Sequence, residues 1–128
     1  MNTAIIGIGS NIDPENNIPL ALKLLGRQVS VEKISEMIRT SPIGITDQPD
    51  FINGAIRIAT NLSKLELEQR LKITEEQIGR VRSLPKFGPR TIDLDLVVWN
   101  DKIVDPDYFS REFLRKSVDE VWLRSADH

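Results

Sequence analysis

The chain of 128 residues predicts an α+β fold, and the order of its hydrophobic patterns is the main evidence. Four segments have the apolar or alternating patterns of strands, and two segments between them carry apolar residues at helical spacing. The order strand–helix–strand–strand–helix–strand is that of a ferredoxin-like βαββαβ fold, an antiparallel sheet with helices packed on one face. With 40% hydrophobic and 28% charged residues, we expect one globular domain over residues 1–128.

The first strand and the first helix are predicted near the N-terminus. The range Thr3–Gly9 is almost entirely apolar, which is typical of a buried strand. The helix begins where Asp13 precedes Pro14, because an N-cap residue followed by proline is a frequent helix start. Its core-facing stripe consists of Ile18, Leu22 and Leu25.

Two strands and a second helix follow. Val31–Arg39 is the second predicted strand, although its alternation is irregular near Lys33. The third strand has Ile52, Ile56 and Ile58 on one face and Phe51, Asn53 and Ala55 on the other. Ser63 and Glu66 have the spacing of a capping box and predict the start of the second helix. The core positions of this helix are Leu67, Leu71 and Ile78.

The fourth predicted strand, Thr91–Trp99, carries two acids on one face. Asp93 and Asp95 point to one side, while Ile92, Leu94 and Leu96 point to the other. Two parallel carboxylates suit a hard divalent cation such as Mg²⁺. The alternative is a solvated strand face, but like charges repel and aspartate is depleted in strands. A last helix is expected over roughly Ser110 to Val121.

The loop before this strand is rich in cations. It runs over Gly79–Arg90, contains no carboxylate, and has two glycines and two prolines that disfavour regular structure. Its cations are Arg80, Arg82, Lys86 and Arg90. Arginine is always charged and binds phosphate in a bidentate manner, so its excess over lysine favours phosphate binding over a merely solvated loop. The cations and the two carboxylates together indicate phosphoryl transfer.

Composition and charge exclude several other classes of function. There is no cysteine, which excludes disulfides, thiolate catalysis and cysteine-ligated metals. The net charge of −2 argues against nucleic acid or a membrane as partner. The apolar run Ala4–Gly9 is too short to span a bilayer and has no basic region before it, so we expect a cytoplasmic protein. The oligomeric state stays open between a monomer and a homodimer.

Two further residues favour a flat ligand. Phe51 and Asn53 share one strand face, so an aromatic ring lies beside an amide. The ring can stack on a heterocycle while the amide pairs with its donor and acceptor edges. An aromatic residue in the core beside a satisfied asparagine is an equally good interpretation of these two residues alone.

The sequence resembles the 6-hydroxymethyl-7,8-dihydropterin pyrophosphokinase family of folate biosynthesis. The resemblance runs from Ile5 to about Phe113. It is carried by three groups of residues: Gly9-Ser10-Asn11, Thr40–Gly44 with Asp47–Asn53, and Gly79–Arg82 with Phe87–Asp95. It implies transfer of pyrophosphate from ATP to the hydroxymethyl group of a dihydropterin, with ATP as co-substrate and two Mg²⁺ ions in each active site.

The resemblance also implies a role for individual residues. Arg80 and Arg90 would be catalytic, and Asp93 and Asp95 would hold the metal ions. The pterin-binding residues would be Ile43, Gly44, Phe51, Asn53 and Phe113. The nucleotide-binding residues would be Glu75, Arg82, Lys86, Leu96 and Arg111.

The chain departs from the family pattern after Trp99. Family members usually have a longer hairpin there and then a His-Pro pair, whereas this chain has Asp105-Pro106. Arg111 and Phe113 keep the family spacing from that pair. The alternative hypothesis is therefore a non-catalytic pterin-binding or regulatory relative with a trimmed ATP site. A small RNA-binding module is a third hypothesis, disfavoured because no pair of sheet aromatics lies beside basic residues.

Overall fold

The computed structural model describes residues 1–79 and 91–122, and its centre is an antiparallel sheet. The strands are β1 (Asn2–Ser10), β2 (Ser30–Ile34), β3 (Ile38–Thr40), β4 (Phe51–Thr60), β5 (Asp93–Trp99) and β6 (Lys102–Ile103). The helices are α1 (Pro14–Gly26), α2 (Lys64–Ile78), α3 (Asp107–Ser110) and α4 (Glu112–Val121). The strand order is β2-β4-β1-β5-β6, with β3 also paired to β4, which confirms the predicted ferredoxin-like α+β fold.

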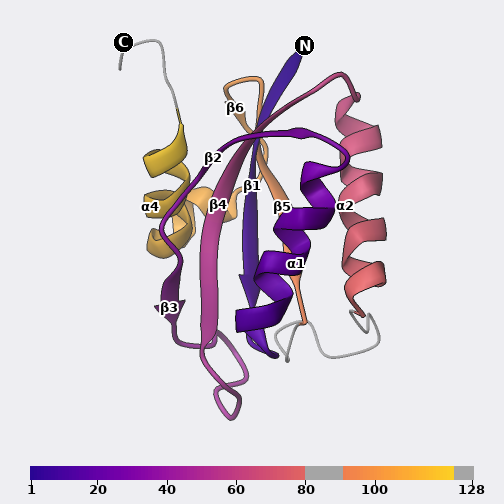
Figure 1. Cartoon of the computed structure of the whole chain (residues 1–128). Coiled ribbons are helices and arrows are strands. Elements are labelled where there is room, and N and C mark those ends of the chain that lie inside the picture. The colour runs from indigo at the N-terminus through magenta and orange to yellow at the C-terminus, as the bar shows by residue number, and fades with distance from the viewer. Residues whose placement is uncertain (80–90, 123–128) are drawn as a thin grey trace.

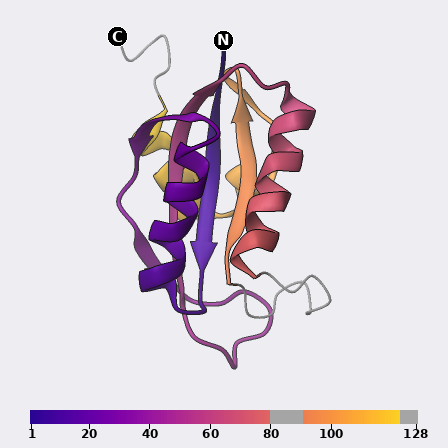
Figure 2. The ribbon, with the colours of Figure 1, turned by 45° about the vertical axis from the view of Figure 1, so that its right-hand side comes forward.

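Both faces of the sheet are covered. Figure 1 shows α1 and α2 on the face toward the viewer, and Figure 2 shows α4 behind the sheet. The first core contains residues of β1, β4 and β5 together with Ile18, Leu25, Leu67 and Leu71 from the two front helices. The second core joins the other face to α3 and α4 through Tyr108, Val118, Val121 and Trp122. The two interstrand helices thus share one face as predicted, and the last helix covers the opposite face.

The predicted second strand is two strands in the structure. Val31–Arg39 is divided into β2 and β3, and the register against β4 shifts between Val31 and Lys33. At the break, the Oγ of Ser35 accepts a hydrogen bond of 2.8 Å from the backbone N–H of Ala55. A side chain therefore replaces part of the backbone ladder, which explains the irregular alternation in the sequence.

The helix boundaries follow local signals with two corrections. The capping box is confirmed, since Ser63 and Glu66 exchange hydrogen bonds of 3.0 and 3.2 Å. Asp13 is at the N-cap of α1, but its carboxylate accepts hydrogen bonds from the side chain of Asn16 and makes no cap bond to the backbone. The predicted last helix is divided at Arg111, whose backbone is extended. No helix within the described ranges has the length and apolar character needed to cross a membrane.

Candidate functional site

A cavity of about 300 Å³ lies between the sheet and the segment formed by α3 and α4. Its lining comes from β1, the end of β3 and the loop after it, the starts of β4 and β5, and the α3–α4 segment. Antiparallel pairing brings the end of β1 beside the starts of β4 and β5, at the lower end of the sheet in Figure 1. The volume is at the lower end of the range for small-molecule sites.

The floor of the cavity is β1, which has two glycines on this face. Gly9 pairs with Asn53 on β4 and with Asp93 on β5, and Gly7 lies two residues earlier. Because neither glycine has a side chain, no side chain at these two positions covers this face of the sheet between β4 and β5. A Cβ added at Gly7 would lie 3.2 Å from Cδ1 of Leu114, so a larger residue here would press against α4.

Asn53 is oriented by two neighbours. Its Nδ2 donates a short hydrogen bond to Oγ1 of Thr40. Its Oδ1 lies so close to Gly9 that a Cβ at that position would collide with it. The half-buried amide is therefore held at its nitrogen, while its oxygen occupies space that the absent side chain of Gly9 leaves, an arrangement that favours recognition of a heterocycle edge.

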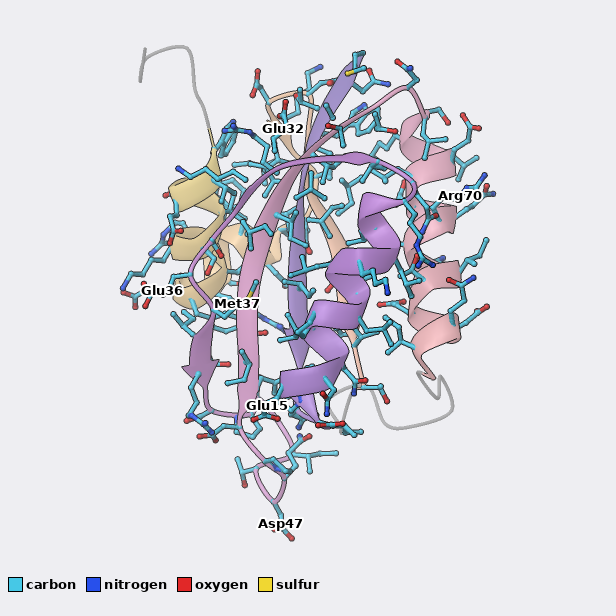
Figure 3. All side chains as sticks on the ribbon, viewed as in Figure 1. Glu15, Glu32, Glu36, Met37, Asp47 and Arg70 are labelled. Atoms are coloured by element: carbon cyan, nitrogen blue, oxygen red, sulfur yellow. The ribbon has the colours of Figure 1, made fainter. Side chains whose placement is uncertain are left out.

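The rim is the loop between β3 and β4. Asn11, buried at the end of β1, donates hydrogen bonds of 2.8 Å to Oε1 of Gln48 and 3.0 Å to the carbonyl of Pro49. Gly44 has a φ of 83°, a backbone conformation that glycine adopts readily. The side chain of Asp47 extends outward at the tip of this loop in Figure 3. The loop is thus largely exposed at its surface but tied to the sheet at its base.

Two carboxylates lie on the β5 side of the cavity. Asp93 is half-buried and Asp95 is exposed, and both line the cavity. Within the described ranges, no three histidine, cysteine, aspartate or glutamate residues are grouped so that they could hold a metal ion. A pair of carboxylates still fits Mg²⁺, because this ion is commonly held by one or two carboxylates together with substrate phosphates. The pair therefore fits Mg²⁺ that completes its coordination with water or with the phosphate oxygens of a ligand.

The opposite wall comes from the α3–α4 segment. The Oδ1 of Asp105 accepts a hydrogen bond of 2.9 Å from the backbone N–H of Asp107, at the start of α3. Nη2 of Arg111 lies 3.7 Å from Oδ2 of Asp107, and both side chains are partly exposed. Phe113 from α4 and Phe51 from β4 both line the cavity, which therefore has an aromatic ring from each of two elements.

The structure brings many of the predicted site residues to one cavity. From the predicted pterin set these are Ile43, Phe51, Asn53 and Phe113. From the predicted metal and nucleotide sets they are Asp93, Asp95 and Arg111. Gly44 belongs to the rim loop but is not among the lining residues.

Two further predicted nucleotide-binding residues that the structure describes, Glu75 and Leu96, do not line this cavity. Leu96 packs against the core under α1 and α2. Glu75 is buried on α2, and its Oε2 accepts a hydrogen bond of 2.8 Å from the backbone N–H of Leu94. The remaining predicted residues, Arg80, Arg82, Lys86 and Arg90, lie outside the described residues.

Sequence reasoning missed several lining residues. Gly7 and Gly9 are not among the predicted site residues, although Gly9 belongs to a motif that carries the family resemblance, and both form the floor. Their alternate positions in an otherwise apolar strand are a usable signal, because glycine inside a strand often marks close approach of a ligand or backbone. Thr40 belongs to a segment that carries the resemblance but has no predicted role. Leu114 and Ser117 have no signal in the sequence, because their place at the cavity depends on packing between distant segments.

The chain is similar in sequence to known pyrophosphokinases. The family model described as 7,8-dihydro-6-hydroxymethylpterin-pyrophosphokinase matches residues 5–122. Similar curated proteins include three named 2-amino-4-hydroxy-6-hydroxymethyldihydropteridine pyrophosphokinase. The Haemophilus influenzae protein is 34% identical over 132 aligned positions, covering 94% of this chain and 82% of that protein.

The other two relatives are longer than the segment they share with this chain. The Bacillus subtilis protein is 38% identical over 109 residues, which cover 83% of this chain and 65% of that protein. The Pseudomonas aeruginosa protein is 36% identical over 103 residues, covering 78% of this chain and 63% of that protein. The chain thus spans slightly less than two thirds of both proteins.

Proposed function

This chain belongs to the 7,8-dihydro-6-hydroxymethylpterin-pyrophosphokinase family, and from this premise we propose that it is a pyrophosphokinase of folate biosynthesis. It would transfer the pyrophosphoryl group of ATP to 6-hydroxymethyl-7,8-dihydropterin. The observation that carries the proposal is one cavity lined both by the aromatic and amide side chains of Phe51 and Asn53 and by the carboxylates of Asp93 and Asp95. Because ATP is the donor, we expect the reaction in the cytoplasm.

The pterin part of the cavity supports binding of a flat, polar-edged ring. Phe51 and Phe113 supply aromatic faces, and an aromatic face gains most from offset stacking on another ring. Asn53, oriented by Thr40, supplies a donor and an acceptor for the ring edge. A ligand lacking those polar groups would cover the half-buried amide without a partner for its oxygen, which is a source of specificity.

The proposed reaction needs positioning more than covalent catalysis. The hydroxymethyl oxygen forms a bond to the β-phosphorus of ATP, the bond from that phosphorus to the α,β-bridging oxygen breaks, and AMP leaves with this oxygen. The hydroxyl proton passes to solvent. Mg²⁺ held by Asp93 and Asp95 would supply neutralisation of phosphate charge when bound. Arg80 and Arg90, carried over from the family pattern, would neutralise the transferring phosphates.

A direct assay tests the proposal. The protein is incubated with 6-hydroxymethyl-7,8-dihydropterin, ATP and Mg²⁺, and AMP and the dihydropterin diphosphate are quantified by chromatography. We expect the two products in equal amounts and none after chelation of Mg²⁺. Asp95→Asn should reduce turnover more than about a hundredfold, because it removes charge from the site of transition-state stabilisation.

The matched control is Asp47→Asn. It makes the same chemical change at the outer tip of the rim loop (Figure 3), at a residue that does not line the cavity, and should leave turnover within about twofold. Absence of AMP from the native protein under saturating substrates would refute the proposed activity. Equal losses in the two variants would refute the role of Asp95.

A second candidate function is pterin binding without catalysis. Four aspartates and one arginine are among the described lining residues, and Arg111 is already near Asp107. This excess of negative charge disfavours a nucleotide that arrives without metal. Calorimetry separates the candidates: a pterin-only protein would bind the dihydropterin but show no heat with Mg²⁺ and α,β-methylene ATP.

A further inference from the structure

Glu75 is a buried acid that the proposed reaction does not use. It lies in the last turn of α2, and only 2% of its surface is exposed. A buried carboxylate is costly unless it receives hydrogen bonds. Its Oε2 accepts one of 2.8 Å from the backbone N–H of Leu94, the residue between Asp93 and Asp95. The acid therefore contacts the backbone near the start of β5, between its two carboxylate residues.

This bond lies at an open edge of the sheet. On one side β5 pairs with β1 from Asp93 to Trp99. On the other side its pairing with β6 involves only Val98 and Trp99. Among the described residues, no strand thus pairs with the outer edge of β5 at Leu94. Strand edges carry backbone donors that need partners, and Glu75 supplies one from a helix.

The position of this contact affects both metal-binding candidates. Successive residues of a strand point to opposite faces, so the direction of the Asp93 and Asp95 side chains depends on the backbone orientation at Leu94. The side-chain oxygen of Glu75 holds this part of the backbone by accepting from the Leu94 N–H. Because α2 packs against β5 and contributes Leu67 and Leu71 to the core, the acceptor is itself held rigidly.

We propose that Glu75 is a positioning residue that fixes the β5 backbone and so directs Asp93 and Asp95 toward a shared divalent cation. This proposal rests on the proposed function, in which those two residues hold Mg²⁺. This role differs from the nucleotide contact that the family resemblance implies for Glu75, because the side chain is buried and accepts a hydrogen bond from the protein backbone.

Two variants of similar size separate the possible roles. Glu75→Gln keeps an oxygen that can accept from Leu94, whereas Glu75→Leu removes the acceptor. The readouts are the hydrogen-exchange rate of the Leu94 amide by NMR and the affinity for Mn²⁺ alone by electron paramagnetic resonance. We expect the Leu variant to exchange the Leu94 amide at least about tenfold faster and to bind Mn²⁺ about tenfold more weakly, as for other residues that support metal ligands. The Gln variant should stay within about threefold of the native protein in both.

Several results would overturn the proposal. One is a Leu variant that loses protection at Leu94 but binds Mn²⁺ like the native protein. Another is a Gln variant that loses Mn²⁺ affinity while its Leu94 amide stays protected, which would assign the effect to charge. If the Leu variant does not fold, the Gln variant still tests the proposal. The proposal requires that the Gln variant retain both the protection of the Leu94 amide and the affinity for Mn²⁺.

These measurements do not depend on turnover. If the native protein binds Mn²⁺ but forms no AMP, the proposed activity is refuted. The role of Glu75 is still decided by the Leu94 exchange rate and the Mn²⁺ affinity of the two variants. Unchanged nucleotide affinity in the Leu variant, measured with α,β-methylene ATP in the absence of metal, would further separate positioning from direct contact.

Discussion

At the scale of single residues, the site depends as much on missing side chains as on present ones. Gly9 leaves room for Oδ1 of Asn53, and Gly7 leaves room for Leu114. Thr40 then holds the other end of the Asn53 amide. The amide cannot turn freely, so a ligand finds its donor and acceptor already in place and loses less conformational entropy on binding.

This arrangement predicts a specific effect of Gly9→Ala. The added methyl group would collide with Oδ1 of Asn53 and force either the amide or the strand to move. We expect the KM for dihydropterin to rise more than about tenfold, because a displaced polar contact costs on the order of 1.5 kcal/mol. The KM for ATP should change much less. Steady-state kinetics with each substrate varied in turn provide the measurement.

The control for this variant is Gly26→Ala. Its Cβ would meet no atom within 4 Å, so the substitution should change neither KM. Thermal unfolding of both variants shows whether Gly9→Ala acts on the site or on the whole fold. An unchanged dihydropterin KM in a folded Gly9→Ala protein would contradict the proposed role of Asn53.

At the scale of elements, the start of α2 is the best-defined local signal. The backbone N–H of Ser63 donates to Oε1 of Glu66, and the backbone N–H of Glu66 donates to Oγ of Ser63. The hydrogen bond from the Ser63 backbone N–H to the Glu66 carboxylate, and after it one from the Ser63 side chain, lower the pKa of Glu66 below its ordinary value of 4.5. The ionised form is thus favoured by folding, and the negative charge also suits the first turn of a helix.

The lowered pKa predicts a pH-dependent effect of Glu66→Gln. A carboxyl group with a lowered folded-state pKa stabilises the protein above pH 4.5, and this contribution disappears as the pH falls through the folded-state pKa. The native protein should therefore have a higher Tm than Glu66→Gln near neutral pH. The difference should shrink progressively below pH 4.5. Scanning calorimetry at several pH values provides the measurement, and a constant difference across that range would contradict this explanation.

At the scale of the whole molecule, α4 is attached to the sheet through its C-terminal end. Nη1 of Arg57 donates a hydrogen bond of 2.7 Å to the carbonyl of Val121, and Nζ of Lys33 donates one of 3.1 Å to that of Glu120. The carboxylate of Glu120 accepts from the backbone N–H of Glu36, a residue of the sheet edge labelled in Figure 3. The opposite end of α4 faces the cavity, so attachment and site lie at different ends of one helix.

Tyr108 connects this helix to α3. Its hydroxyl donates a hydrogen bond of 2.6 Å to Oδ1 of Asp119, and its ring packs edge-on against Trp122 at 6.1 Å between centroids. Tyr108→Phe keeps the ring and removes the hydrogen bond. We expect a loss of about 2 kcal/mol in the free energy of unfolding, since hydrogen bonds to charged groups contribute about that much. Urea denaturation measures it.

A double-mutant cycle isolates this bond. Asp119→Ala is combined with Tyr108→Phe, and the two effects should be strongly non-additive because both substitutions remove the same contact. Additive losses would mean that the two side chains stabilise the protein independently. Phe109→Leu is the surface control, since that side chain is 66% exposed and its replacement should change stability by less than about 0.5 kcal/mol.

The features that the sequence alone determined are those that depend on local backbone geometry. Strand alternation separated Asp93 and Asp95 from Leu94 and Leu96, and the structure has the last two in the core under α1 and α2. The capping box fixed the start of α2 for the same reason, since Ser63 and Glu66 meet across one helical turn. Such periods follow from the peptide backbone and need no knowledge of distant residues.

Tertiary structure alone decided the features that join distant segments. Three of these features require residues far apart in sequence to meet. They are the packing of α4 on the sheet, the glycine floor of the cavity, and the hydrogen bond from the Leu94 N–H to Glu75. The division of the predicted second strand was also decided there, by a Ser35 side chain bonded to β4. Their physical basis is the pairing of backbone donors and the burial of apolar surface across elements, which depend on the whole fold.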